Sequence, residues 1–183
     1  MDDAPETLRA RLASLERGTS TAEALAFYDS LPATPVEAMI GAWRGRDLET
    51  GHPFDGMLPR FGWHGKRFES AEDVHPLVFA KPDGTLYSVT PSAATLKALK
   101  DYPKLVRRPR MPKIVRTLSP LTATTKPKAR LRRLEFRGVL TAAMIYDTLP
   151  IIDVFRSVDA DLVVGCMDMR GDAEPYLFIL ERE

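Results

Sequence analysis

The chain has 183 residues, of which 44% are hydrophobic and 28% are charged, and its formal net charge is +1 at pH 7. A chain of this length can bury one sizeable core, and its near-zero charge excludes a global field that would attract it to nucleic acid or to membranes. The single cysteine, Cys166, excludes an intramolecular disulfide and fits a reducing compartment. The N-terminus carries acids and no apolar run, so we expect no signal peptide, no membrane span and a cytoplasmic location.

Two helices are predicted at the start of the chain. Residues 3–17 carry leucines at helical spacing. Ser20 and Glu23 have the spacing of a capping box for a second helix, which Pro32 ends. We therefore assign residues 1–33 to an N-terminal helical segment that forms a cap or an outer wall of the fold.

Residues 34–183 are predicted to form a single, mainly β domain. Residues 42–48 are the first strand candidate, and residues 75–90 predict a hairpin because two apolar runs flank the turn sequence Lys-Pro-Asp-Gly. Residues 129–183 show a succession of strand patterns with turn signals between them, which is typical of a β-meander. Pro150 divides one long apolar run there into two strands.

The intervening residues 91–128 form a basic connection rich in Pro, Lys and Arg. One short helix is expected over residues 93–99, and most of the remainder is expected to be an irregular excursion outside the sheet. The basic run over residues 97–133 suits an acidic partner or nucleic acid. Tyr102 is the only aromatic residue of this connection and no nucleic-acid-binding fold is recognisable, which disfavours nucleic acid.

These patterns together give about eight to ten antiparallel strands. A closed barrel removes exposed sheet edges, and a barrel of about eight strands leaves room for one small ligand. Helices followed by strands are also typical of an α+β sandwich. We prefer a β-barrel whose first half is residues 34–90 and whose last part is residues 129–183.

Two long stretches resemble a known family. The segments GAWRG, GHPFDGMLPRFGWHGKRF and DVHPLVF resemble the bacterial GXWXG protein family, and RGVLTAAMIYDTLPIIDVFRSVDADLVVGCMDM resembles the domain of unknown function (DUF4334-type) that usually follows it. The similarity runs from about residue 35 to residue 183. It implies a fold and no established activity.

The glycine and tryptophan pattern at the start of the first strand is also similar to the calycin group, which includes the lipocalins. That resemblance implies a lipocalin-like barrel in which Trp43 closes the floor, with Gly41 and Gly45 allowing close backbone approach. An arginine commonly packs on this tryptophan in the group, and Arg137 and Arg156 are the candidates here.

The same resemblance implies a helical lid between the first two strands. Residues 55–62 occupy the corresponding place, and Asp55 is expected to cap the lid helix, with Pro59 in its first turn. Haem binding of the nitrobindin type needs a histidine late in the chain, and none follows His75. We therefore expect no cofactor.

Inward-facing aromatic and polar residues are the expected ligand-binding set. If Arg137 points inward beside Tyr146, it offers a fork for a carboxylate head group, whereas strand alternation alone favours a solvated outer face. Aromatic side chains and methionine suit the wall of an apolar cavity or an ordinary core. The predicted ligand-binding residues are Trp43, His52, Phe54, Trp63, His75, Phe79, Arg137, Met144 and Tyr146.

The candidate catalytic residues are His52, His75 and Asp153. Histidine titrates near neutral pH, so either histidine could transfer protons with Asp147 or Asp153 orienting it, although histidines that only hold loop backbone are commoner. The histidine spacing does not match a metal site, and the nucleophile, P-loop and dinucleotide motifs are absent. Whether the chain is an enzyme stays open.

We expect the chain to bind a small hydrophobic or amphipathic molecule in an internal barrel cavity, with a buried polar anchor adding affinity. The alternative is a cofactor-independent isomerase, cyclase or dehydratase that uses a histidine in the same cavity. A third interpretation is an interaction module that binds an acidic partner through the basic connection. The sequence leaves the ligand and the oligomeric state open.

Overall fold

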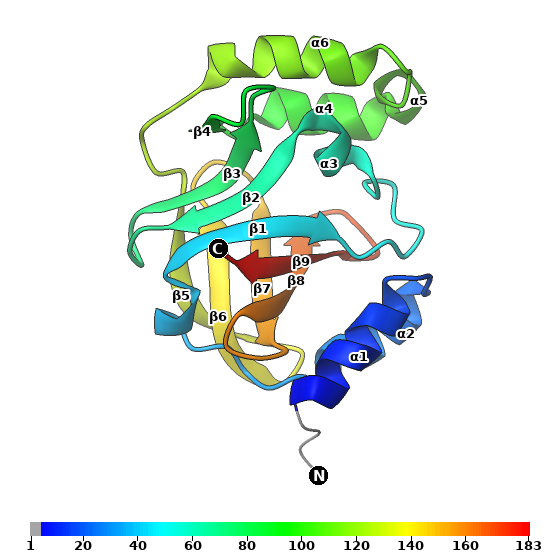
Figure 1. Ribbon diagram of the computed structural model, residues 1–183, viewed down its shortest axis with the longest axis vertical. Helices are drawn as coiled ribbons and strands as arrows, with labels where there is room; N and C mark the ends of the chain where they lie inside the picture. The colour runs from blue at the N-terminus through cyan, green and yellow to red at the C-terminus, as the bar shows by residue number, and fades with distance from the viewer. Residues whose placement is uncertain (1–4) are drawn as a thin grey trace.

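The computed structural model describes residues 5–183, apart from the side chains of Pro5, Pro103 and Val106, and it is dominated by one antiparallel sheet (Figure 1). The nine strands follow the order β2-β1-β9-β8-β7-β6-β5-β3-β4, and β2 also pairs with β3, so the sheet closes in a ring. β4 extends β3 beside the closed ring. The strands are β1 (Gly41–Asp47), β2 (Trp63–Phe68), β3 (Val74–Ala80), β4 (Leu86–Ser88), β5 (Ala129–Phe136), β6 (Val139–Tyr146), β7 (Ile151–Ser157), β8 (Leu162–Met169) and β9 (Tyr176–Arg182). The mainly β expectation is therefore confirmed.

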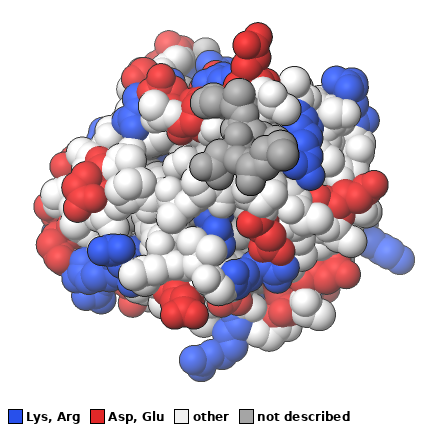
Figure 2. Space-filling view, turned by 90° about the horizontal axis from the view of Figure 1, so that it is seen from below, with Lys and Arg blue, Asp and Glu red and all other residues white. Residues whose placement is uncertain are grey.

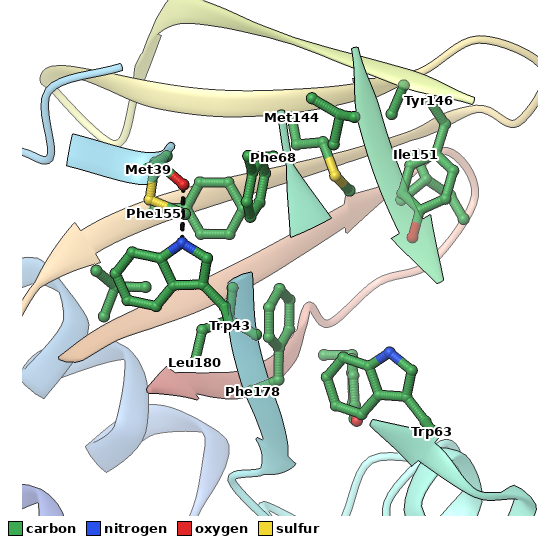
Figure 3. Packing of buried hydrophobic residues seen from close by; sticks show 14 of the residues in the cluster. Met39, Trp43, Trp63, Phe68, Met144, Tyr146, Ile151, Phe155, Phe178 and Leu180 are labelled. Atoms are coloured by element: carbon green, nitrogen blue, oxygen red, sulfur yellow. Dashed lines mark hydrogen bonds between the residues drawn. The ribbon is translucent and has the colours of Figure 1, made fainter. Parts of the chain in front are cut away.

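Strand alternation separates two apolar clusters, one inside the ring and one outside it. Along β9, Phe178 and Leu180 belong to the interior cluster, whereas Leu177 and Ile179 belong to the outer one. Successive side chains of a strand point to opposite faces, so a continuous apolar run such as β9 is covered on both faces. The interior cluster fills the ring with aromatic side chains, methionine and aliphatic residues (Figure 3).

The two glycines of the GXWXG segment make room for large side chains. A Cβ on Gly45 would lie 2.2 Å from Cη2 of Trp63, so the indole of Trp63 packs directly on the β1 backbone. A Cβ on Gly41 would lie 2.9 Å from Nη1 of Arg182, and Gly41 also has a φ of +132°, which favours glycine. The close backbone approach expected at these glycines is thus explained by two specific neighbours.

The outer cluster lies between the sheet and the N-terminal helices α1 (Pro5–Leu15) and α2 (Thr21–Ser30). Its helical members include Leu12, Phe27 and Tyr28, which face strands β8 and β9. The capping box of Ser20 and Glu23 is present as expected. Residues 3 and 4 of the predicted first helix lie outside the described residues.

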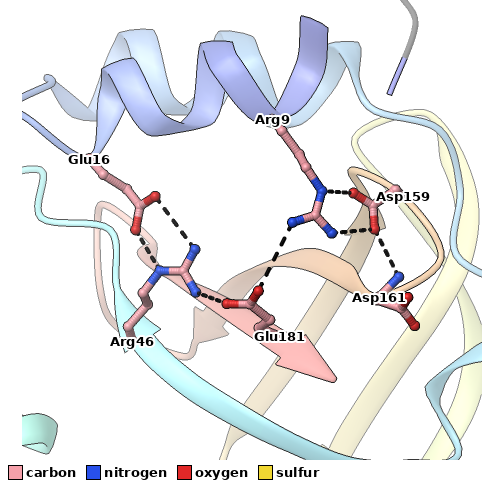
Figure 4. Close-up of polar contacts among 6 residues, drawn as sticks. All are labelled: Arg9, Glu16, Arg46, Asp159, Asp161 and Glu181. Carbon is pink, nitrogen blue, oxygen red and sulfur yellow. Dashed lines mark hydrogen bonds and ion pairs between the residues drawn. The ribbon is translucent and has the colours of Figure 1, made fainter. Parts of the chain in front are cut away.

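An ion-pair network joins α1 to the outer face of the sheet (Figure 4). Arg46 of β1 lies between Glu16, at 2.5 Å, and Glu181 of β9, at 2.9 Å. Arg9 pairs with Asp159 in the turn between β7 and β8. Exposed pairs contribute little each, so the apolar contacts of α1 carry most of its attachment.

The basic connection is more helical than expected. It contains α4 (Ala93–Asp101), α5 (Pro103–Val106), α6 (Met111–Leu118) and the 3-10 helix η2 (Ser119–Thr122), and these cover one end of the ring together with α3 (Met57–Phe61) (Figure 1). The expectation of one helix and an irregular excursion is therefore wrong beyond α4. Prolines divide this region into helices too short to show clear periodicity in the sequence.

The helices of this end are attached to the ring interior by a few side chains. Leu96, Leu99 and Val115 pack against the interior cluster. The predicted cap of α3 is also corrected, because the N-cap residue is Gly56 and it makes no side-chain cap bond. Asp55 instead accepts from the backbone N–H groups of Thr50, at 2.8 Å, and of Gly51, at 2.7 Å, and so holds the loop before α3.

The expected hairpin is confirmed as β3 and β4, whose strands pair at Val78 and Ser88. The C-terminal meander is confirmed as β5 to β9, in which each strand pairs with the next. Pro150 lies in the turn before β7, as expected for a residue that lacks an N–H donor.

Candidate functional site

A polar pair lies inside the ring among apolar side chains. Nζ of Lys66 on β2 is 2.7 Å from Oδ2 of Asp153 on β7, and both side chains are 3% exposed or less. Nζ also donates to the Pro76 carbonyl at 3.2 Å. In the closed strand order β2 and β7 lie on opposite sides of the ring, so this ion pair crosses the interior.

The two charges point inward because of their places in the strand pattern. Lys66 is paired with Trp43 across β1 and β2, and Asp153 is paired with Met144 across β6 and β7. Residues that face each other across a strand pair share one side of the sheet. Because Trp43 and Met144 belong to the interior cluster, the lysine and the aspartate share that side.

Aromatic rings surround the ammonium group. Nζ of Lys66 lies 5.0 Å from the ring centroid of Phe178, 5.7 Å from that of Tyr146 and 5.8 Å from that of Trp63. Cation–π attraction adds to the ion pair in such a setting. Figure 3 shows the Trp63 indole and the Tyr146 ring on the same side of the interior.

Part of the hydrogen-bonding capacity of this polar centre is unused. Oδ1 of Asp153 and Nε1 of Trp63 are buried and have no hydrogen-bond partner among residues 5–183. An ammonium group has three N–H donors, and Lys66 uses two of them on Asp153 and Pro76. The centre therefore offers one acceptor and two donors to a further group.

Burial sets the protonation of the groups in this centre. Desolvation raises the pKa of Asp153, and the charge of Lys66 opposes that rise. Desolvation also raises the pKa of Tyr146 well above its ordinary value, so its hydroxyl stays neutral. A buried carboxylate that keeps its charge needs its cation, and each charge here depends on the other.

His52 lies in the loop between β1 and α3, apart from the ion pair. Its Nδ1 accepts from the Phe54 backbone N–H at 3.1 Å, and its ring packs against Phe54 and Tyr176, at centroid distances of 5.3 and 5.6 Å. Burial lowers the pKa of His52, and the nearby negative charge of Asp55 offsets part of that lowering. The neutral ring therefore holds this loop on the core.

A polar surface hollow of about 480 Å³ opens beside His52. It lies between the turn after α1 and the loop before α3, and its wall carries charges of both signs. Its lining residues are Glu16, Arg17, Gly18, Thr19, Glu49, Gly51, His52, Asp55 and Arg107. This hollow is on the surface and does not include the predicted aromatic wall.

A second surface hollow, of about 570 Å³, lies next to β4. Its wall combines a few apolar side chains with hydroxyl groups and two cations. The lining residues are Arg67, Val78, Leu86, Tyr87, Ser88, Ala123, Thr124, Thr125 and Lys126. It too lies outside the interior cluster.

The other two histidines also have local partners. His75 on β3 is buried, with Nε2 3.6 Å from Oε1 of Glu69, and burial lowers its pKa. Nε2 of His64 lies 2.7 Å from Oε1 of Glu183. No hydrogen bond or ion pair within residues 5–183 joins His52 or His75 to Asp153, so the three predicted catalytic residues do not form one hydrogen-bonded site.

Trp43 is buried near the start of β1, opposite Arg182 at the end of β9, and we call this part of the molecule the closed end of the ring. Its Nε1 donates to the Met39 carbonyl at 2.7 Å, which Figure 3 shows as a dashed line. The arginine on its ring is Arg182, whose Cζ lies 4.3 Å from the ring centroid. Neither candidate arginine takes that place, because Arg156 packs over Tyr28 at 5.3 Å, beneath α2.

Arg137 does not provide an inward fork for a ligand. It lies in the turn between β5 and β6 with a φ of +50°, and its side chain is 39% exposed. Its guanidinium donates to both carboxylate oxygens of Asp29 at 2.6 Å. Because Arg137 lies in a turn between β5 and β6, strand alternation does not apply to it, and its pairing with Asp29 places its side chain outside the ring.

The remaining predicted ligand residues belong to the interior cluster, namely Phe54, Trp63, Phe79, Met144 and Tyr146. Sequence reasoning missed Lys66, which is the residue that gives this cluster its charge. Lys66 stands beside Arg67 in the mostly polar segment Trp63–Phe68, so no local signal marks it as an inward charge. Within residues 5–183 no group of three or more His, Cys, Asp or Glu side chains could hold a metal ion.

The comparisons with known proteins agree with this architecture. The family model described as GXWXG protein matches residues 26–84, and that described as Domain of unknown function (DUF4334) matches residues 127–182. The crystal structure of a protein from Thermomonospora curvata is 34% identical, with a TM-score of 0.70, and the match covers 97% of this chain and 99% of that one. No curated protein matches the chain. The chain therefore belongs to the GXWXG protein family and carries the DUF4334 domain of that family in its C-terminal strands.

Proposed function

We propose that the chain binds a small apolar or amphipathic molecule inside the ring, with the polar group of the ligand against Lys66 and Asp153. The supporting observation is the unused hydrogen-bonding capacity of a buried ion pair. An unpartnered buried polar atom costs free energy, and Asp153 Oδ1 and Trp63 Nε1 are two such atoms. Both belong to residues that contact the Lys66 ammonium, Asp153 through the ion pair and Trp63 through its ring. A ligand that pairs with them removes that cost.

The chemistry of the centre favours a neutral hydroxyl compound. A hydroxyl group accepts from the Lys66 ammonium or the Trp63 indole and donates to Asp153 Oδ1, so one group serves both needs. A carboxylate ligand would place a second negative charge beside Asp153 in a region of low dielectric. A plain alkane would leave both polar atoms unpaired.

Entry of a ligand requires side chains to move. The interior residues near Lys66 are buried, and Leu96, Leu99 and Val115 close the interior at the end covered by α3 to α6. The opposite end is fixed by Trp43 and Arg182. We therefore place the entrance at the helical end.

The architecture on which this proposal rests is a lipocalin-like barrel with a helical lid. A ring-shaped antiparallel sheet, a tryptophan at one end and an arginine over its ring are compatible with that fold. Helices α3 to α6 would then be the lid. Cytoplasmic location belongs to the same proposal and is supported by the single cysteine, Cys166, which is buried.

A panel of matched ligands tests the proposal. Titration calorimetry and native mass spectrometry would compare a medium-chain primary alcohol with the alkane and the carboxylic acid of the same length. A hydrogen bond to a charged group contributes about 1.5–3 kcal/mol, so the alcohol should bind roughly ten- to a hundredfold more tightly than the alkane. Equal binding of alcohol and alkane, or no bound mass with either, would overturn it.

Two variants separate the anchor from the fold. The double substitution Lys66→Met with Asp153→Leu replaces the ion pair by apolar groups and should abolish the preference for the alcohol while the circular dichroism spectrum is retained. Arg137→Met is the matched control, because it removes a charge outside the ring and should leave ligand affinity unchanged. If only Arg137→Met changed the affinity for the alcohol, the ligand would be held by Arg137 and not by Lys66 and Asp153.

A second candidate is proton-transfer catalysis by the same pair. The observation that favours it is the raised pKa of Asp153, which suits a buried acid or base. The histidine-dependent alternative lacks a contact between either histidine and this centre. Deuterium incorporation beside the carbonyl of a bound ketone in heavy water, lost in Asp153→Asn, would establish an enzyme.

A further inference from the structure

An exposed apolar row runs along the outermost helix of the molecule. Ile114 and Leu118 of α6 are 46% and 53% exposed, and Leu121 in η2 is 82% exposed. Residues four apart lie on the same helix face, so Ile114 and Leu118 form one stripe. Val115 points to the interior cluster instead, which fixes the orientation of α6 on the protein.

Basic side chains flank this row. Arg110 precedes Ile114 by four residues and so stands on the same line of the helix, and Lys113 lies beside it. Neither cation has a carboxylate partner among residues 5–183, and Lys104 and Arg108 in the preceding segment have none either. The exposed cations of this surface are therefore available to an anionic partner.

Positive charge is concentrated in the helical segment of the chain. Residues 93–128 contain ten Lys and Arg against the single acid Asp101, and since the chain carries +1, the remaining residues carry −8. The face opposite the helices shows acidic and basic side chains interspersed (Figure 2). Such a distribution orients the helical end toward a negative surface.

We propose that α6 and η2 bind the surface of a membrane that contains anionic lipids. The apolar row of Ile114, Leu118 and Leu121 would insert at the boundary of head groups and acyl chains, while Arg110 and Lys113 contact lipid phosphates. An amphipathic helix with Lys and Arg beside an apolar face has the composition of an interfacial helix. Within residues 5–183 no helix is long and apolar enough to span a membrane.

The combination of charges and aliphatic side chains selects a membrane over the other anionic partners. Nucleic acid binds cations through its phosphates and stacks bases on aromatic rings, whereas this row is aliphatic. Contact with a hydrated phosphate backbone does not remove leucine and isoleucine side chains from water, so it gives them no hydrophobic stabilisation. A lipid interface satisfies both the cations and the aliphatic side chains.

Vesicle flotation tests the proposal with the full chain. The probes are vesicles of phosphatidylcholine alone and vesicles of phosphatidylcholine with phosphatidylserine. Each Lys or Arg near an anionic surface contributes about 1 kcal/mol, so the protein should float with the phosphatidylserine vesicles at least about tenfold more than with the neutral ones, and added salt should weaken this binding.

Two pairs of substitutions separate the surface from general effects of charge and hydrophobicity. Leu121→Ser should lower partitioning by about tenfold, whereas Leu140→Ser, at a leucine that is 49% exposed on β6, should leave it unchanged. Arg110→Glu should lower it by at least about tenfold, whereas Arg133→Glu, an exposed charge on β5, should have much less effect.

Three outcomes would overturn the proposal. They are equal flotation with both kinds of vesicle, equal loss in the matched control variants, and retention by RNA at moderate salt without vesicle binding. Dimers that depend on Leu121 in analytical ultracentrifugation, without flotation, would assign the apolar row to a second copy of the chain instead. None of these results depends on the internal ligand.

Discussion

The two ends of the ring are built in different ways. At the closed end, Trp43 is fully buried, hydrogen-bonded to Met39 and covered by Arg182, whose guanidinium also reaches three backbone carbonyls. At the helical end, α4 to α6 rest on the interior through a few partly buried side chains and leave aliphatic residues exposed. The closed end is therefore held by more buried contacts than the helical end, where we propose that a ligand enters and that a membrane docks.

Substitution of one aromatic residue at each end should show the largest difference in stability between the two ends. Trp43→Ala should lower the free energy of unfolding by about 4 kcal/mol, because it removes a buried indole from a close-packed interior. Tyr102→Ala, at a residue that is 61% exposed between α4 and α5, should cost less than about 0.5 kcal/mol. Urea denaturation measures both. If the two variants lost equal free energy of unfolding, the two ends would be equally well packed and the proposed difference between them would be wrong.

The ion pair between the two ends should give the next largest effect. Lys66→Met leaves the Asp153 carboxylate buried without its cation and should cost about 3 kcal/mol. The double variant Lys66→Met with Asp153→Leu should regain most of that loss, because no unpaired charge remains. A double variant as unstable as the single one would show that the side-chain shapes, and not the charges, matter here.

The strand framework could be predicted from the sequence because its signals are local. The turn at Lys-Pro-Asp-Gly, the break at Pro150 and the capping box of Ser20 each depend on neighbours within a few residues. The prediction that Trp43 is a buried residue of the first strand came from the resemblance to the calycin group, and Trp43 is buried on β1. The helices after α4 were missed because each is too short for its periodicity to be read.

The candidate site could be predicted only in part, because it depends on distant pairings. Trp63, Met144 and Tyr146 were expected to line the interior, and they do belong to that cluster. Lys66 meets Asp153 across the ring, and Arg182 reaches Trp43 from the last strand, so neither pairing leaves a trace in local sequence. Such contacts depend on the order of the strands in the closed sheet, which the local sequence does not specify.

A smaller loss is expected when the arginine over Trp43 is replaced. Arg182→Met removes the cation from the indole face and the hydrogen bonds to the carbonyls of Ala38 and Ile40, and should cost about 1–2 kcal/mol. Arg137→Met is its control, since it breaks one exposed pair with Asp29 and should cost about 0.5 kcal/mol. Thermal unfolding followed by circular dichroism compares the two. If Arg137→Met costs more, Arg182 is not part of what fixes the closed end.

A further, pH-dependent effect is expected from the two buried histidines. Burial lowers the pKa of His52 and of His75, so the unfolded chain takes up protons first as the pH falls below about 6.5. The stability that they contribute is complete above that pH and is lost as the pH falls toward their folded pKa values. Unfolding of His52→Gln and His75→Gln between neutral and mildly acidic pH should each show a shallower decline than the parent chain. An unchanged slope in both variants would mean that other groups govern the acid side.

The smallest effect on stability is expected at the exposed row of α6 and η2. If the helical end is loosely packed, substitutions of its exposed residues should hardly change the free energy of unfolding. Leu118→Ser and Leu121→Ser replace side chains that are more than half exposed, so each should change the free energy of unfolding by less than about 0.5 kcal/mol. Urea denaturation in the absence of vesicles measures this. A loss above about 2 kcal/mol would show that these leucines are packed in solution, for instance between copies of the chain. The helical end would then be as fixed as the closed end, and neither ligand entry nor membrane contact could be assigned to it.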